Sequence, residues 1–211
     1  MAPDCFLDIE ALQTADDGVE RHPLRPFLPE NARVLFLGSF PPQRKRWCMD
    51  FFYPNYSNDF WRIAGLVFYG DKDHFVDLQN KTFRLPLIVQ FLNDKGIALY
   101  DTCAAIRRLK DNASDKFLEV VEPTNIKALI EALPHCRLMV TTGEKATETL
   151  MTHFGITDVL KVGHTRPTGL LNHDNITIEA YRLPSSSRAY PMNITKKAEF
   201  YREMFIHAGI L

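Results

Sequence analysis

Short runs of hydrophobic residues recur along the chain and indicate strands that are buried on both faces. The first run covers residues 33–37 and ends at Gly38, and similar runs cover residues 97–100 and 138–140. Residues 176–183 alternate between apolar and polar positions, which is typical of a strand with one buried face. The four segments predict a central sheet of about four strands, and the continuous apolar runs indicate that most of them are parallel.

Segments with helical periodicity separate these strands. Residues 59–69 are apolar nearly all round and predict a buried helix, and residues 85–94 predict a second helix. Thr124 and Asn193 are suited to cap two further helices, and another helix follows Gly143. This alternation predicts an α/β fold, a three-layer α/β/α sandwich with a mostly parallel central sheet.

The domain organisation follows from the distribution of these elements. Residues 1–30 are acidic and contain several prolines, which predicts an N-terminal arm that wraps around a domain of residues 31–211. Residues 101–116 are predicted to form a polar loop. The length of 211 residues suits one domain with a sizeable core. A composition of 45% hydrophobic and 24% charged residues excludes disordered, collagen-like and coiled-coil proteins.

The charge of the chain limits the partners that it can bind. A formal net charge of −1 excludes a protein that is basic all over, so a nucleic acid would have to be held by a local basic patch. Basic residues cluster near the loops expected at one edge of the sheet: Arg44-Lys45-Arg46, Arg107-Arg108, Arg188 and Lys196-Lys197. Each cluster alone is typical of a solvated surface, whereas together they indicate such a patch.

The cysteines and the N-terminal sequence exclude other classes of protein. The four cysteines lie far apart and form no Cys-x-x-Cys pair, so neither a zinc ribbon nor an iron–sulfur cluster is expected, and no metal is predicted. The chain has no apolar run of signal-peptide length at its start and no run long enough to cross a membrane. We therefore expect a cytoplasmic protein, associated with the nucleoid if it is bacterial.

Two loops at the carboxyl edge of the predicted sheet have unusual compositions, and this edge is where ligands of open parallel sheets bind. The first loop begins at Gly38, contains Pro41 and Pro42, and continues into an aromatic segment over residues 51–61. Aromatic rings beside rigid backbone donors suit a flat heterocycle, which needs a stacking face and edge hydrogen bonds. Tyr53 is a candidate for that stacking face, and packing in the core is the alternative.

The second loop has the sequence Leu183-Pro184-Ser185-Ser186-Ser187-Arg188. Its hydroxyls, backbone amides and arginine would form a small surface that holds phosphates. A plain polar turn is the alternative, since serine-rich turns are common.

The combined pattern resembles the uracil-DNA glycosylase superfamily and is most similar to its hypoxanthine-DNA (deoxyinosine) glycosylase branch. The segment Gly38-Ser39-Phe40-Pro41-Pro42 is similar to the first motif of that branch, Gly-Ser-Phe-Pro-Ser. Residues 51–61 resemble the aromatic segment that follows this motif, and residues 183–187 resemble the second motif. The resemblance extends over roughly residues 30–207.

The resemblance implies an enzyme of base-excision repair that hydrolyses the N-glycosidic bond of a deaminated base flipped out of DNA. It implies no cofactor, damaged double-stranded DNA as the partner, and a monomer. The backbone cradle for the base would be formed by Gly38, Ser39, Phe40 and Pro41. Tyr53 would stack on the base, and Asn58 matches an asparagine proposed as catalytic in the deoxyinosine branch. The phosphates of the DNA would be held by Ser185, Ser186, Ser187 and Arg188.

Departures from the family pattern affect the expected substrate and roles. Members that remove uracil strongly usually carry a water-activating Asp or Asn at the position of Phe40, so hypoxanthine is favoured over uracil here. Asn58 also has a structural alternative, because Asn58 or Asp59 is suited to cap the following helix. We expect Asp59 to cap that helix alone. Asp101 is interpreted as a structural residue.

Two other functions are compatible with the sequence. One is a catalytically silent DNA- or nucleobase-binding module of the same fold, which would bind damaged DNA with a salt-dependent affinity and release no base. The other is a small-molecule enzyme on a nucleotide-binding sheet. It is the weaker alternative, because the chain has neither a Gly-x-Gly-x-x-Gly sequence nor a Walker-type phosphate loop.

Overall fold

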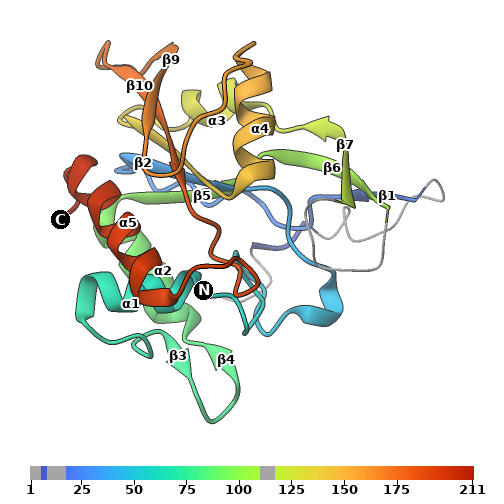
Figure 1. The fold of residues 1–211 in the computed structure, drawn as a ribbon, viewed down its shortest axis with the longest axis vertical. Helices are drawn as coiled ribbons and strands as arrows, with labels where there is room; N and C mark the ends of the chain where they lie inside the picture. Colours follow the sequence, from blue (N-terminus) through green and yellow to red (C-terminus); the bar gives the residue numbers. More distant parts are fainter. Residues whose placement is uncertain (1–5, 9–17, 110–116) are drawn as a thin grey trace.

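The centre of the computed structural model is a five-stranded sheet, in a structure that describes residues 6–8, 18–109 and 117–211 (Figure 1). The strands, in spatial order, are β5 (Ile97–Asp101), β2 (Val34–Gly38), β8 (Leu138–Thr142), β10 (Thr177–Leu183) and β9 (Thr165–Leu171). The first four are parallel, and β9 pairs antiparallel with β10. The prediction of an α/β fold on a mostly parallel sheet is confirmed.

The edge strand β9 is not evident from the hydrophobic pattern. It contains Pro167 and Gly169, and none of its residues is buried. Proline is tolerated at the edge of a sheet because its missing N–H would face solvent there. The sheet therefore has one strand more than the sequence pattern predicts.

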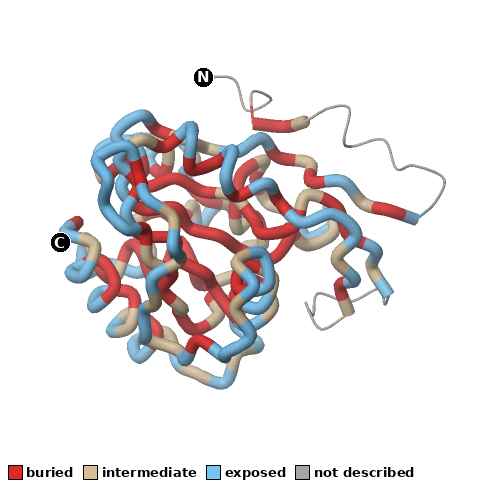
Figure 2. Tube along the Cα trace, turned by 90° about the horizontal axis from the view of Figure 1, so that it is seen from above, coloured by how far each residue is buried: buried red, intermediate tan, exposed pale blue. Residues whose placement is uncertain are grey.

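Helices cover both faces of the sheet, and strand β2 shows how the sequence divides them. Val34 and Phe36 belong to the hydrophobic core on one face, and Leu35 and Leu37 belong to the core on the other, as the two-residue period of a strand requires. The first face carries α1 (Phe60–Tyr69), α2 (Leu85–Lys95) and α5 (Ile194–His207), and the second carries α3 (Ile126–Glu131) and α4 (Glu144–His153). The buried strands form the middle layer (Figure 2).

Of the caps predicted for helices α3 and α5, the structure has the one for α5. Asn193 caps α5, since its side chain accepts a hydrogen bond of 2.8 Å from a backbone amide of the first turn. Helix α3 is capped by Asn125 and not by Thr124. The Thr124 hydroxyl donates instead to the carbonyl oxygen of Asp101 at 2.7 Å, and this bond ties the start of α3 to the end of β5.

Part of the predicted polar loop after β5 is a strand instead. Strand β6 (Cys103–Arg108) is the middle of a small antiparallel sheet with β1 (Val19–Arg21) and β7 (Leu118–Pro123). Its buried Cys103 and Ile106 pack with Phe40 and Leu118. Because these apolar residues are followed by two arginines, the hydrophobic pattern of the segment is weak. A further short hairpin consists of β3 (Val76–Asp77) and β4 (Thr82–Phe83).

The described part of the N-terminal arm lies against the domain. Phe6 and Leu24 are buried in the main core, and the backbone of Phe27 pairs with Leu99 of strand β5. The arm thus covers a strand that would otherwise expose unpaired backbone groups at the edge of the sheet. The rest of the arm, and residues 110–116 of the predicted loop, lie outside the described residues.

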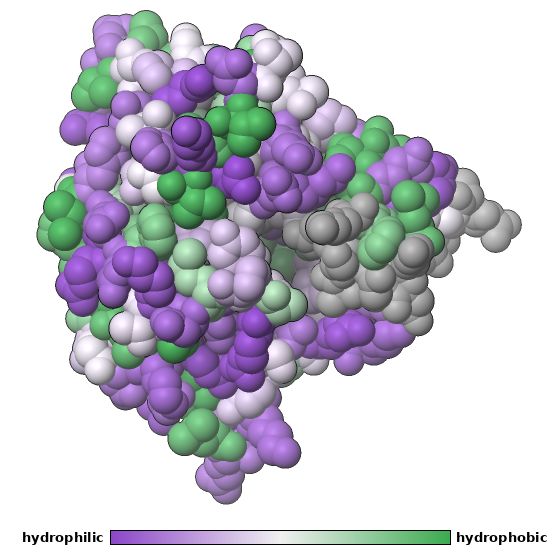
Figure 3. Space-filling view, viewed as in Figure 1, coloured by the Kyte–Doolittle hydropathy of each residue, from purple (hydrophilic) through white to green (hydrophobic). Residues whose placement is uncertain are grey.

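The surface is mainly hydrophilic on the face shown in Figure 3, where hydrophobic residues form small separate groups. Among the described residues, no helix combines the length and the apolar character needed to cross a membrane. Helix α5 has 14 residues, whereas a helical span needs about 20.

Candidate active site

The carboxyl ends of four parallel strands meet at one edge of the central sheet. Gly38 of β2 lies beside Asp101 of β5, and Thr142 of β8 lies beside Leu183 of β10. A pocket opens at this edge, and the predicted site residues that line it are Gly38, Ser39, Phe40, Pro41, Tyr53, Asn58, Ser185, Ser186 and Ser187. Arg188 lines a neighbouring hollow instead. The fold therefore brings both motif segments to one pocket, although they lie far apart in the sequence.

A close approach between backbone and carboxylate explains the glycine at the end of β2. A Cβ atom on Gly38 would lie 2.3 Å from Oδ1 of Asp101, a distance that Cβ atoms essentially never show. Only glycine fits beside this carboxylate without a shift of the chain. The glycine therefore makes room for a side chain of the protein itself, and not only for a ligand.

Tyr53 is packed against the core and also lines the pocket. Its ring is stacked on that of Phe60, with centroids 3.7 Å apart and planes 5° from parallel. Its hydroxyl lies 3.0 Å from Oγ1 of Thr142. The backbone φ of Tyr53 is 51°, in the left-handed region, which costs a non-glycine residue about 1–3 kcal/mol. The stacked ring and the hydroxyl contact hold this strained residue in one orientation beside the pocket.

Asn58, which directly precedes the N-cap position Asp59, makes the side-chain capping bond of helix α1. Its Oδ1 accepts a hydrogen bond from the backbone N–H of Phe60 at 2.9 Å, whereas Asp59 makes no side-chain capping bond. The expectation that Asp59 caps this helix alone is therefore wrong. Because a backbone N–H needs an oxygen acceptor, the capping bond fixes which end of the Asn58 amide carries the oxygen. The Nδ2 group, with its two N–H donors, is then left for a ligand in the pocket that Asn58 lines.

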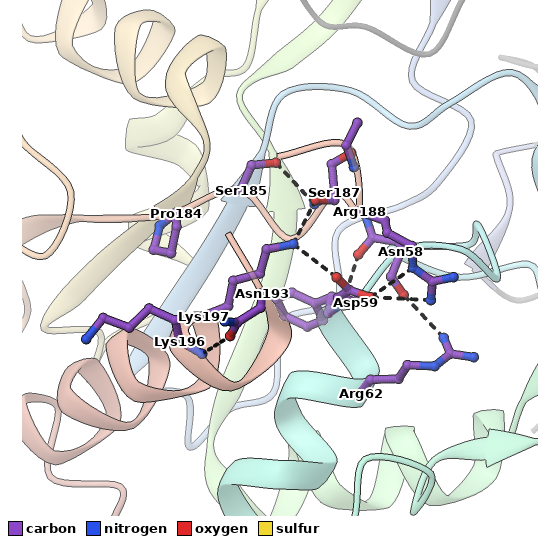
Figure 4. Close-up of polar contacts among 12 residues, drawn as sticks. Asn58, Asp59, Arg62, Pro184, Ser185, Ser187, Arg188, Asn193, Lys196 and Lys197 are labelled. Carbon is purple, nitrogen blue, oxygen red and sulfur yellow. Dashed lines mark hydrogen bonds and ion pairs between the residues drawn. The ribbon is translucent and has the colours of Figure 1, made fainter. Parts of the chain in front are cut away.

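Asp59 does not cap α1 because its carboxylate belongs to a buried ion pair (Figure 4). Its Oδ2 lies 3.0 Å from Nζ of Lys197, a residue with 0% of its surface exposed. The same ammonium donates to the carbonyl oxygen of Ser187 at 2.8 Å, and the Asp59 amide donates to the carbonyl oxygen of Ser186 at 3.0 Å. Arg188 reaches the other carboxylate oxygen at 3.4 Å. These contacts hold the loop of residues 183–188, called the serine loop below, against the start of α1.

Burial raises the pKa of Tyr201, which lies beside this ion pair. Its hydroxyl therefore stays protonated and donates to the carbonyl oxygen of Pro184 at 3.3 Å. Two side chains of α5, Lys197 and Tyr201, thus hold backbone carbonyl groups of the serine loop.

Most of the basic clusters expected to form a common patch are paired within the protein. Lys197 is buried, and Arg108 makes a bidentate pair with Glu20 at 2.9 Å to each carboxylate oxygen. Ion pairs with neighbouring carboxylates also engage Arg44, Arg107 and Lys196. The expectation that whole clusters contribute to the patch is therefore wrong for Lys197 and Arg108, whose charges are neutralised inside the structure.

A buried histidine–carboxylate pair at the pocket is not evident from the sequence. Nε2 of His22, which directly follows β1, lies 2.8 Å from Oδ2 of Asp101, and both residues are buried. Nδ1 of His22 lies 2.9 Å from the carbonyl oxygen and 3.2 Å from the amide nitrogen of Leu24. A protonated Nδ1 donates to the carbonyl, and a bare Nδ1 accepts from the amide. When Nε2 carries a proton it donates to Asp101, which lines the pocket, and in the neutral ring Nδ1 is then the bare nitrogen that accepts from the amide of Leu24.

The sequence carries little signal for this pair. Its members are separated by 79 positions, and His22 belongs to neither motif segment. The one available signal is the place of Asp101 directly after a buried strand, at the edge of the sheet where ligands bind. From its sequence context Asp101 is interpreted as structural rather than catalytic, and the structure places it in the lining of the pocket.

Two groups next to Asp101 stay protonated at neutral pH. Burial, and after it the charge of Asp101, raises the pKa of the Tyr100 hydroxyl. Burial raises the pKa of the Cys103 thiol to about 11, so this thiol is not an activated nucleophile. In the part of the chain that the structure describes, no group of three or more His, Cys, Asp or Glu residues is placed to hold a metal ion.

Comparison with known proteins shows a likeness to a solved structure. No protein-family model matches the chain, and no curated protein sequence matches it. The chain is similar to the solution NMR structure of a Methanosarcina acetivorans protein that is provisionally described as a uracil DNA glycosylase. The sequence identity is 25% and the TM-score 0.55, over 90% of this chain and 99% of the other. This likeness supports a fold of the uracil-DNA glycosylase type over nearly the whole chain.

The buried ion pair predicts a large difference between two adjacent lysines. We expect Lys197→Met to lower the free energy of unfolding by about 3–5 kcal/mol, because it leaves the carboxylate of Asp59 buried without its main partner. Lys196→Met is the matched control, since Lys196 forms an exposed pair with Glu199 that contributes about 0–1 kcal/mol. Urea unfolding of both variants measures the difference. Equal midpoints would show that the buried pair does not stabilise the structure.

Proposed function

We propose that this protein is a DNA glycosylase that hydrolyses the N-glycosidic bond of a flipped-out deaminated base, with hypoxanthine favoured over uracil. The observation that carries the proposal is the single pocket that unites both motif segments with the Asn58 amide. The likeness to a protein described as a uracil DNA glycosylase supports the same reaction class. The proposed partner is damaged double-stranded DNA, acted on by a monomer in the cytoplasm without a cofactor.

The proposed mechanism relies on stabilising the departing base. Cleavage leaves positive charge on the sugar, as in other glycosidic hydrolyses, and negative charge on the base. The Nδ2 donors of Asn58, held by the capping bond to Phe60, are oriented before the reaction begins. The backbone N–H groups of Ser39 and Phe40 lie in residues that line the same pocket. Donors fixed in this way act on charge that develops in the transition state.

Asp101 is the proposed determinant of base selection. Deamination of adenine or cytosine converts a ring nitrogen that accepts hydrogen bonds into an N–H donor. An ionised carboxylate can only accept hydrogen bonds, so Asp101 favours the deaminated base over its parent. His22 supports this role, because its Nε2–H holds Oδ2 of Asp101 at 2.8 Å and leaves Oδ1 beside Gly38 in the pocket wall.

The serine loop is proposed to hold DNA phosphates. The hydroxyl oxygens of Ser185 and Ser187 accept hydrogen bonds from backbone amides two residues further on. Each hydroxyl proton then remains a donor for a phosphate oxygen. Arg188 follows directly, and its side chain is 59% exposed.

Two substitutions of Asn58 separate its proposed catalytic role from its capping role. Asn58→Asp keeps an oxygen acceptor for the Phe60 amide and loses the Nδ2 donors, whereas Asn58→Ala loses both. We expect base release to fall by about 100-fold or more in each variant, the usual effect of losing one transition-state donor. Only Asn58→Ala should lose stability, by about 1 kcal/mol, the usual cost of a lost cap. The measurements are single-turnover base release and urea unfolding.

The release assay uses labelled duplexes that carry hypoxanthine, uracil, xanthine or a thymine mismatch, followed by alkaline strand cleavage. Full activity of Asn58→Asp would assign Asn58 to capping alone. A folded wild-type protein that binds these duplexes in a salt-dependent manner but releases no base would favour the catalytically silent module.

Asp101→Asn tests base selection by a ratio of rates. We expect the wild-type protein to release hypoxanthine faster than unsubstituted purine, which lacks the ring N–H. In Asp101→Asn this preference should shrink about 10- to 100-fold, because a hydrogen bond to a charged group contributes about 1.5–3 kcal/mol. A purely structural role would lower both rates together and leave their ratio unchanged, which would refute the proposed base contact.

A further inference from the structure

A hollow lies beside the pocket that both motif segments line, which is the proposed base pocket, and residues adjacent in the sequence line the two. Asn58 and Ser187 line the base pocket, whereas the residues that follow them in the sequence, Asp59 and Arg188, line the hollow. The hollow is completed by Arg62 of α1 and by Lys72, which lies shortly after that helix. A ligand that extends out of the base pocket across these paired residues therefore enters the hollow.

The hollow is electropositive because its one carboxylate is already neutralised. Asp59 is paired with the fully buried Lys197 and, at the longer distance of 3.4 Å, with Arg188. Because Lys197 already balances this one carboxylate, the lining with Arg62, Lys72 and Arg188 keeps a net positive charge. Lys72 forms an ion pair of 2.5 Å with the adjacent Asp73, but the two side chains are 56% and 29% exposed. Such exposed pairs contribute little energy and exchange readily for another anion.

Arg62 gives the hollow a rigid donor. The residue is only 8% exposed, and its guanidinium lies 4.7 Å from the ring centroid of Tyr56. Its Nη1 reaches the carbonyl oxygens of Tyr56 and Asn58 at 2.8 and 3.4 Å. A guanidinium has five N–H donors, so these two contacts leave donors for an anion. Figure 4 shows the guanidinium groups of Arg62 and Arg188 on the same side of Asp59.

We propose that this hollow binds a backbone phosphate of the DNA next to the flipped nucleotide, with Arg62, Lys72 and Arg188 as its ligands. The site rests on the proposed function. It adds Arg62 of α1 and Lys72, shortly after that helix, to the phosphate ligands that the serine loop provides. A phosphate diester carries one negative charge and oxygens that match the fork of an arginine. The phosphate contacts position the duplex and carry no sequence information.

The test compares Lys72→Gln with Lys127→Gln in DNA binding. Lys127 is an exposed lysine on α3, which covers the opposite face of the sheet from α1. The affinity for a lesion duplex is measured over a range of salt concentrations. We expect the slope of log K against log[salt] to become shallower by about 0.9 in Lys72→Gln, the value for one phosphate contact with a duplex. The Lys127→Gln control should keep the wild-type slope.

Duplexes with one uncharged methylphosphonate linkage locate the contact. The wild-type protein should lose affinity when a linkage next to the lesion is neutralised, and Lys72→Gln should lose less at that linkage because one of the three ligands is already missing. An unchanged salt slope, or equal losses in both proteins at every linkage, overturns the phosphate site while base release by the wild-type protein still supports the glycosylase. A wild-type protein that binds DNA without releasing a base overturns the enzymatic proposal. The salt slope and the methylphosphonate losses then still decide whether the phosphate site exists. Absence of DNA binding overturns both.

Discussion

The ion pair between Lys197 and Asp59 joins the last helix, the first helix and the serine loop at one buried point. Two charges are costly to remove from water unless each finds close partners. Here the ammonium also reaches the carbonyl oxygen of Ser187, and the carboxylate also reaches Arg188. The position of the serine loop depends on these contacts, and so does the wall of the base pocket that this loop forms.

The same ion pair determines the role of Asn58. Because Lys197 engages the carboxylate of Asp59, the first turn of α1 is capped by Asn58 instead. The capping bond uses Oδ1 and turns the amide so that its donors are left for the pocket. A structural constraint in the core therefore sets the orientation of the group that is proposed to act on the departing base. Under the proposed function, capping and catalysis would use opposite ends of one amide.

The sequence predicts the layers of this fold better than it predicts its contacts. Buried strands such as β2 are recognisable because both faces are apolar, whereas β9 is exposed and contains Pro167, so its pattern is weak. Motif spacing predicts which loops meet, since parallel strands end at one edge. It does not distinguish Asn58 from Asp59 as a cap, because both residue types cap helices well. The distinction depends on Lys197, far along the chain, and the pairing of His22 with Asp101 is equally non-local.

The distribution of charge reconciles a net charge of −1 with the proposed DNA partner. Several basic groups are neutralised by carboxylates of the protein, whereas Arg62, Lys72 and Arg188 lie together in the hollow beside the pocket. The pocket lining contains the buried carboxylate of Asp101, and Arg108 in the same lining is paired with Glu20. A carboxylate there repels phosphate and accepts a neutral base that offers an N–H donor, whereas the cationic rim attracts phosphate. Under the proposed function, this arrangement sorts the parts of one nucleotide, since the base is favoured inside the pocket and the backbone outside it.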